Sequence, residues 1–177
     1  MRMSLKNQRS LWYLPPIKND VVYTPTAVAK DIIDWCNPIG SCLDPCLGDG
    51  SFFEHLPSPK QWCEIEKGKD FFDHKDKYDW IIGNPPYSIF EDWIIHSFEL
   101  GDNIVYLLPT NKVFQRHAIM SIINSYGGIF GMRIYGSGQK ICLPFGFSVG
   151  AFHFKRDWKG KTDISFKIEW DARAKTN

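Results

Sequence analysis

Residues 80–87 read Trp-Ile-Ile-Gly-Asn-Pro-Pro-Tyr, a strand-like apolar run that leads directly into a stiff polar loop. Pro85 and Pro86 lack backbone donors and restrict the chain, so the turn after the strand is rigid. The Asn84 side-chain oxygen and the Pro85 carbonyl could together accept both hydrogens of an NH2 group, while the Tyr87 ring stacks on the planar group that carries it. An ordinary structural turn is the alternative.

On both sides of this stretch, segments of strand length alternate with helical segments, which predicts an α/β sheet. Helices are expected after Pro25, with Thr24 as the cap, from a Ser88/Glu91 capping box to Leu100, and over residues 112–126. The expected strands are 41–44, 61–66, 80–83, 103–108, 129–135 and 149–155, with an edge strand over 164–170.

Two further polar loops follow predicted strands, at the sheet edge where α/β proteins bind ligands. The loop 44–50 reads Asp-Pro-Cys-Leu-Gly-Asp-Gly, with Gly48 and Gly50 where the backbone must turn and a ligand could approach. Glu64 and Glu66 follow the next strand, where a carboxylate can accept hydrogen bonds from ribose hydroxyls. Taken alone, the glycine loop fits an ordinary turn better than a nucleotide site, and the two acids do not distinguish a ribose site from ordinary surface carboxylates.

The 177 residues suffice for one domain over residues 1–177, with an irregular segment at 1–20 and a C-terminal extension at 158–177. The composition is 44% hydrophobic and 23% charged, which excludes disorder as the default state. The N-terminus is polar and no apolar run is long enough to cross a membrane, so we expect a soluble cytoplasmic protein. The five cysteines match neither a disulfide framework nor a zinc site, so we expect reduced thiols and no metal.

Charge is distributed unevenly along the chain. Residues 1–110 carry 10 Lys and Arg against 16 Asp and Glu, a net charge of −6, whereas residues 111–177 carry 11 against 4, a net charge of +7. This polarity suggests that the C-terminal part meets an anion, although a basic segment that aids solubility has the same composition. The basic residues that could face phosphates are Lys112, Arg116, Arg133, Lys140, Lys155 and Arg156.

The order of these motifs resembles a known enzyme family over about residues 21–157. Tyr-Thr-Pro at 23–25 comes first, followed by Asp-Pro-x-x-Gly-x-Gly at 44–50, the acidic strand end, Asn-Pro-Pro-Tyr at 84–87 and Leu-Pro-Thr-Asn at 108–111. This order resembles the S-adenosylmethionine-dependent N6-adenine DNA methyltransferases, in the subgroup whose extra cofactor motif is N-terminal. The resemblance implies a Rossmann-like class I methyltransferase fold, mostly parallel, with an antiparallel strand near the C-terminus.

The resemblance also implies roles for individual residues. The first motif would contact the methionine end of S-adenosylmethionine, the glycine loop would cradle the cofactor, and two acidic positions would hold its ribose and adenine. These cofactor-binding residues are Tyr23, Thr24, Pro25, Asp44, Pro45, Gly48, Gly50, Glu64, Asp70 and Phe71.

The same resemblance assigns the target amine and base to the Asn-Pro-Pro-Tyr loop, with Asn84, Pro85, Pro86 and Tyr87 as catalytic residues. An aromatic before the last core strand would pack on the flipped base, while core packing is the alternative for each candidate. The substrate-binding candidates are Tyr87, Phe145, Phe147, Lys112, Arg116 and Lys140.

The sequence departs from the family in two ways. Glu64 and Asp70 are six residues apart, where the family usually inserts a helix and a strand, so the third strand of the sheet is expected to be missing. No target-recognition segment follows Asn111, which leaves low specificity, a short motif read by the loops, a homodimer or a separate specificity subunit.

The implied function is methyl transfer to a flipped adenine in DNA. The alternatives are RNA adenine or a protein glutamine as acceptor, or a non-catalytic protein that binds cofactor or DNA. The small size fits a phage or restriction-modification setting, by analogy only.

Overall fold

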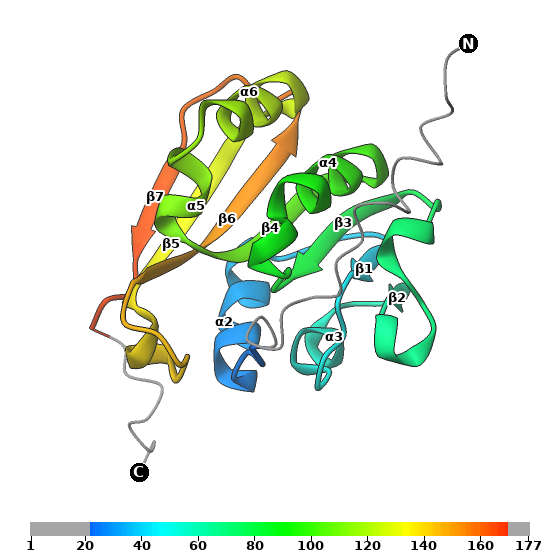
Figure 1. Ribbon diagram of the computed structural model, residues 1–177, viewed down its shortest axis with the longest axis horizontal. Coiled ribbons are helices and arrows are strands. Elements are labelled where there is room, and N and C mark those ends of the chain that lie inside the picture. Colours follow the sequence, from blue (N-terminus) through cyan, green and yellow to red (C-terminus); the bar gives the residue numbers. More distant parts are fainter. Residues whose placement is uncertain (1–21, 170–177) are drawn as a thin grey trace.

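A mixed seven-stranded sheet runs through the computed structural model, which describes residues 22–169 (Figure 1). The strand order is β2-β1-β3-β4-β6-β5-β7. All neighbouring pairs are parallel except those of β6, which is antiparallel to both β4 and β5. This topology confirms the expected fold class. The strands are β1 (Cys42–Asp44), β2 (Lys60–Trp62), β3 (Tyr78–Gly83), β4 (Gly101–Pro109), β5 (Gly127–Ser137), β6 (Ser148–Arg156) and β7 (Asp163–Phe166).

Helices pack on both faces of the sheet (Figure 1). Side chains alternate along each strand, so Ile81 packs toward α4, α5 and α6, whereas Ile82 packs toward α2 and α3. Burial on both faces explains why the central strands are continuous apolar runs. The α-helices are α2 (Thr26–Cys36), α3 (Ser51–His55), α4 (Phe90–Leu100), α5 (Thr110–Phe114) and α6 (His117–Tyr126). Short 3-10 helices are η1 (Ile65–Lys67), η2 (Phe71–Asp73), η3 (Tyr87–Ile89) and η4 (Gly138–Ile141).

The helix expected over residues 112–126 is two helices, α5 and α6. Arg116 between them has extended backbone angles, φ −120° and ψ 126°. In one continuous helix Val113 and Ile119, six positions apart, would point about 120° away from each other, yet both belong to the same core cluster. The break rotates α6 so that both residues face the core.

Both predicted helix caps are wrong. Pro25 is the N-cap of α2, and the Thr24 side chain does not cap it. The helix α4 begins at Phe90, after η3, with Ile89 as its N-cap, so Ser88 is not the cap that the sequence predicts. The rigid Pro-Pro turn is followed by a 3-10 turn, which delays the start of the α-helix.

The edges of the sheet differ from the expected strand lengths. The strand expected at 61–66 ends at Trp62, because Glu64 pairs with Lys69 across the tight turn that contains η1. Within the described residues β2 is therefore an edge strand, and the expected loss of the third strand is confirmed. At the other edge, β7 pairs with β5, so part of the C-terminal extension belongs to the sheet.

The expected irregular segment 1–20 lies outside the described residues. Across residues 22–169, no helix is both long and apolar enough to span a membrane.

Candidate functional site

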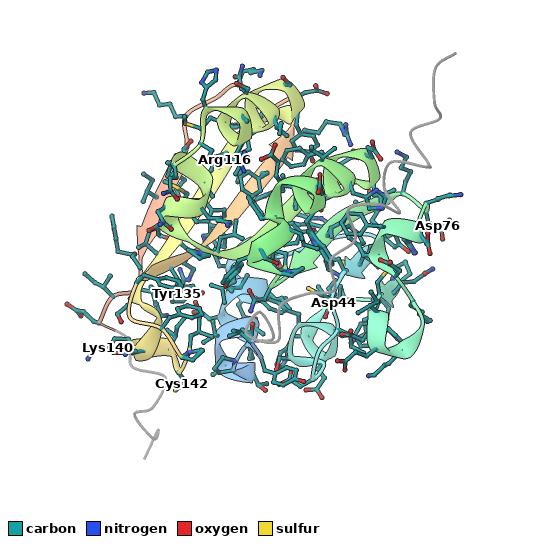
Figure 2. All side chains as sticks on the ribbon, in the orientation of Figure 1. Asp44, Asp76, Arg116, Tyr135, Lys140 and Cys142 are labelled. Carbon is teal, nitrogen blue, oxygen red and sulfur yellow. The ribbon has the colours of Figure 1, made fainter. Side chains whose placement is uncertain are left out.

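The predicted cofactor and target loops meet at one edge of the sheet. Asp44 ends β1, Asn84 follows β3, and Glu64 lies shortly after β2, so three neighbouring parallel strands deliver these side chains together. The loop before β6 reaches the same edge, because β6 runs in the opposite direction. Figure 2 shows Asp44 in the interior of the molecule and Lys140 at its periphery.

Asp44 is a buried carboxyl group with half of its hydrogen-bonding capacity unused. Its Oδ1 accepts a hydrogen bond from the Cys46 backbone N–H at 3.2 Å, while Oδ2 is buried and has no partner among the described residues. Burial raises the pKa of Asp44 to about 7, and the nearby carboxylates of Glu64 and Asp49 add to this rise. An unsatisfied buried oxygen is costly, so this position suits a ligand that donates hydrogen bonds or carries positive charge.

The glycine loop after Asp44 is braced by Glu64. The Gly48 N–H donates to Glu64 Oε2 at 2.8 Å, and the φ angles of Gly48 and Gly50 are +54° and +93°, where side chains are strained. A Cβ atom on Gly48 would lie 3.2 Å from the Tyr23 ring, so this ring covers the loop closely. No atom would lie within 4 Å of a Cβ on Gly50, so the loop is open there.

The Asn84 side chain has a fixed orientation. Its Nδ2 donates to the Val22 carbonyl at 3.0 Å, which assigns Oδ1 as the free acceptor. This Oδ1 is buried and has no partner within residues 22–169. The backbone carbonyl of Asn84 accepts a hydrogen bond from Cys46 Sγ at 3.1 Å, which ties the loop to the glycine turn. Asn84 therefore presents an unsatisfied acceptor beside buried Pro85, next to the Tyr23-Thr24-Pro25 segment.

The predicted aromatic residues come together next to this acceptor. The ring of Phe145 meets Tyr87 edge-on, with centroids 6.2 Å apart and planes at 62°. Phe147 stacks on Phe145 with centroids 4.1 Å apart and planes at 7°. A Cβ on Gly138 would lie 2.8 Å from the Phe145 ring, so the glycine allows the ring to lie against the backbone. The three rings follow one another outward from the Asn84 loop.

The prediction that Phe71 faces the cofactor adenine is wrong. Its ring is 2% exposed and packs in the core against Trp93, at a centroid distance of 4.6 Å, and against His96. Asp70 accepts a hydrogen bond from the Phe72 N–H at 3.0 Å and caps η2, so its visible role is local. After the short turn from Glu64 to Asp70, the Phe71 side chain packs in the core against α4.

Ile65 is a candidate that the sequence interpretation missed. It directly follows Glu64 and is 43% exposed, which leaves an apolar surface beside the acid expected to hold ribose. Its signal in the sequence was an apolar residue inside the charged run 64–67.

The basic residues divide into two groups. Lys112 and Arg116 line a groove of about 340 Å³ between η3, the start of α4 and the α5–α6 break, where Arg116 pairs with Glu91 at 2.6 Å. Arg133 is 17% exposed and pairs with Asp31 at 2.7 Å inside the fold, so the expectation that it faces phosphates is wrong. Arg156 pairs with exposed Asp102 at 2.7 Å and stays 38% exposed, so its phosphate contact remains a prediction.

The remaining side chains considered in the sequence are Lys155 and the five cysteines. Lys155 lies over the Phe130 ring, with Nζ 4.9 Å from its centroid. All five cysteines are free thiols, as expected, and Cys142 is the exposed one.

No protein-family model matches the sequence, and no curated protein matches it. Solved structures do match. A modification subunit of a candidate type I restriction enzyme from Vibrio vulnificus aligns with a TM-score of 0.61 and 15% identity, over 92% of this chain and 49% of that one. A candidate class I S-adenosylmethionine-dependent methyltransferase from Listeria monocytogenes aligns with a TM-score of 0.63 and 12% identity, over 89% and 68% of the two chains.

A candidate RNA methyltransferase from Pyrococcus horikoshii aligns with a TM-score of 0.56 and 15% identity, over 87% of this chain and 99% of that one. The chain spans about half the length of the restriction subunit that it resembles. At these identities the similarity establishes the fold. The protein has the Rossmann-like fold of the class I S-adenosylmethionine-dependent methyltransferases.

Proposed function

We propose that the protein transfers a methyl group from S-adenosylmethionine to the exocyclic amino group of adenine in DNA. The observation that carries this proposal is the fixed Asn84 amide. Because its Nδ2 is occupied by the Val22 carbonyl, its buried Oδ1 can only accept a hydrogen bond, and no described residue supplies one. An NH2 group is the ligand that this acceptor and the Pro85 carbonyl would satisfy together.

The residues at the sheet edge fit the cofactor. S-adenosylmethionine would supply an electrophilic methyl group on a positively charged sulfonium. Asp44 offers the unpartnered buried oxygen described above, and the open glycine loop leaves room for close approach at Gly50. Glu64 and Ile65 would face the ribose and adenine, and Tyr23 would cover the methionine end. We assign Asp70 no role in cofactor binding.

Asn84 and Pro85 would activate the amino nitrogen by positioning. In adenine the lone pair of this nitrogen is delocalised into the ring, so the group is a weak nucleophile. Two hydrogen bonds, one from each amino hydrogen, would favour a more tetrahedral nitrogen and fix its direction. Pro86 contributes by keeping the loop rigid. On transfer the nitrogen–methyl bond would form as the sulfonium–methyl bond breaks, S-adenosylhomocysteine would leave, and the methylated, positively charged amine would release a proton to water. This role therefore needs acceptors rather than a strong base.

The aromatic rings favour a nucleobase over a protein glutamine as acceptor. A base must leave its stack to reach Asn84, and stacking against Tyr87 and Phe145 would offset part of the few kcal/mol that unstacking costs. A glutamine side chain has no ring to use these surfaces. Lys112, Arg116 and Lys140 are the candidates for phosphate contacts, and a second copy or a separate specificity subunit would supply sequence readout.

The experiment supplies methyl-labelled S-adenosylmethionine to the purified protein with three acceptors: unmethylated DNA, an RNA transcript of the same sequence and a glutamine-containing peptide. We expect label in DNA, lost in Asn84→Ala and retained in Asn124→Ala, which removes an exposed amide on α6. Label in RNA or peptide alone would move the assignment to that acceptor. Cofactor binding without transfer to any of the three would indicate a non-catalytic protein.

A further inference from the structure

We propose that the Phe145–Phe147 pair forms a stacking platform for the nucleotide next to the target, and that the substrate is therefore single-stranded at the site. This inference rests on the proposed function and adds the state of the nucleic acid. It concerns Phe147 above all, because Phe145 already contacts Tyr87 at the target position.

The platform consists of the two stacked rings of Phe145 and Phe147. The rings of Phe145 and Phe147 are nearly parallel, at 7°, and their centroids are 4.1 Å apart, so each covers one face of the other. Phe147 nevertheless remains 47% exposed, so its surface away from Phe145 is open to solvent. An exposed aromatic face continuing an ordered stack is a ready surface for one more flat ring.

The platform is held in place by its own loop. The Gly138 N–H donates to the Phe147 carbonyl at 3.0 Å, and the Leu143 N–H donates to the Gly138 carbonyl at 2.9 Å. The close approach of Phe145 to Gly138 fixes the inner ring. A surface that is ordered before binding loses little conformational freedom on binding, so its stacking energy contributes to affinity.

The position of Phe147 distinguishes a single strand from a duplex. When one base flips out of a duplex, its neighbours stay paired and stacked, so only the target would find a ring. In a single strand the adjacent base is free to stack on Phe147 while the target lies against Tyr87. Stacking on aromatic side chains is independent of sequence, as every base has a π-face. Lys140, exposed in the same loop, is placed to meet the backbone.

The test measures binding of a fluorescein-labelled 12-nucleotide DNA strand with a single adenine, alone and as a duplex, by anisotropy. A second strand carries an abasic site next to the adenine. We expect the protein to bind the intact single strand about tenfold more tightly than the duplex or the abasic strand, within the range measured for one stacked base. Methylation rates on the same three substrates should follow this order.

Three variants decide whether Phe147 is responsible. Phe147→Leu should bind the intact strand about tenfold more weakly than the wild type does. On the abasic strand, Phe147→Leu and the wild type should bind equally, because both changes remove the same contact. Phe147→Trp should retain binding. Phe166→Leu, on β7 and 68% exposed, controls for the loss of an exposed ring and should bind normally.

This inference would be overturned if the protein bound the single strand and the duplex equally well. It would also be overturned if the affinity losses from Phe147→Leu and from the abasic site multiplied when the two changes were combined. Adenine methylation could still occur in that case, so the proposed function would stand. Conversely, single-strand binding with the expected variant pattern but no methylation would support the platform and refute the proposed reaction.

Discussion

Replacing Asp31 with alanine tests how helix α2, which follows the Tyr23-Thr24-Pro25 segment, is anchored. Asp31 lies on α2, and its carboxylate accepts hydrogen bonds from Arg133 Nε at 2.7 Å, from Arg133 Nη2 at 2.8 Å and from the Tyr135 hydroxyl at 2.7 Å. Lys167, just beyond β7, adds an ion pair at 3.2 Å. One carboxylate therefore joins α2 to β5 and to the C-terminal extension.

The expected loss of stability follows from burial. The side chains of Asp31 and Arg133 are 16% and 17% exposed, so the pair is largely removed from water. Removing one member of a buried pair costs about 3–5 kcal/mol, because the other charge stays behind. Remaining solvent access places Asp31→Ala near the lower end, about 3 kcal/mol. For a chain of 177 residues this lowers Tm by roughly 6–12 °C.

Thermal unfolding followed by circular dichroism measures this effect, with Asp31→Ala, Arg133→Ala and the double variant side by side. The double variant should lose less than the sum of the single losses, because both changes break one interaction. Burial raises the pKa of Asp31, but hydrogen bonds from Arg133 and Tyr135 outweigh it and hold the pKa below its usual value. The contribution is thus present above about pH 4 and lost as pH falls below it. A Tm change under 2 °C, or fully additive losses, would refute this reasoning.

Three further predictions concern the site and the thiols. Burial raises the pKa of Asp44 to about 7, so the folded protein keeps a proton that the unfolded chain releases near pH 4, and the contribution of Asp44 to stability falls between pH 4 and 7. Burial lowers the pKa of His153 to about 4, which acts in the opposite direction over the same range, so the test is a difference: in urea titrations the wild type should lose stability relative to Asp44→Asn as the pH rises from 4 to 7. Gly48→Ala should weaken cofactor binding in calorimetry by about tenfold or more, since the new Cβ meets the Tyr23 ring at φ +54°, whereas unchanged affinity would contradict the close contact between Tyr23 and Gly48. Cys142 should react first with a thiol reagent and Cys63 only on unfolding, because burial raises the pKa of Cys63 to about 11; equal rates would contradict the packing.

The fold and the convergence of the candidate-site loops are predictable because their signals are local. An apolar run that ends in Asn-Pro-Pro-Tyr defines a central strand and its loop without knowledge of any partner. Asp44, Gly48 and Asn84 are each adjacent to a strand end, so the sheet topology alone brings them to one edge.

The remaining features depend on contacts that the sequence does not display. Asp31 and Arg133 are 102 positions apart, so Arg133 looked like a free surface cation. Phe71 was placed by analogy, although the short turn before it sends its ring into the core. The break at Arg116 is marked in the sequence only by the change in helical phase between Val113 and Ile119, since the segment 112–126 contains no Gly or Pro.

The decisive measurement is nucleoside analysis of DNA after incubation with the protein and S-adenosylmethionine. The DNA is digested to nucleosides, and methylated bases are quantified by mass spectrometry beside the Asn84→Ala and Asn124→Ala variants. N6-methyladenine that appears with the wild-type protein and Asn124→Ala, and disappears in Asn84→Ala, is the predicted result. N4-methylcytosine in its place, or N6-methyladenine that persists in Asn84→Ala, would contradict the proposed role of the Asn84 amide.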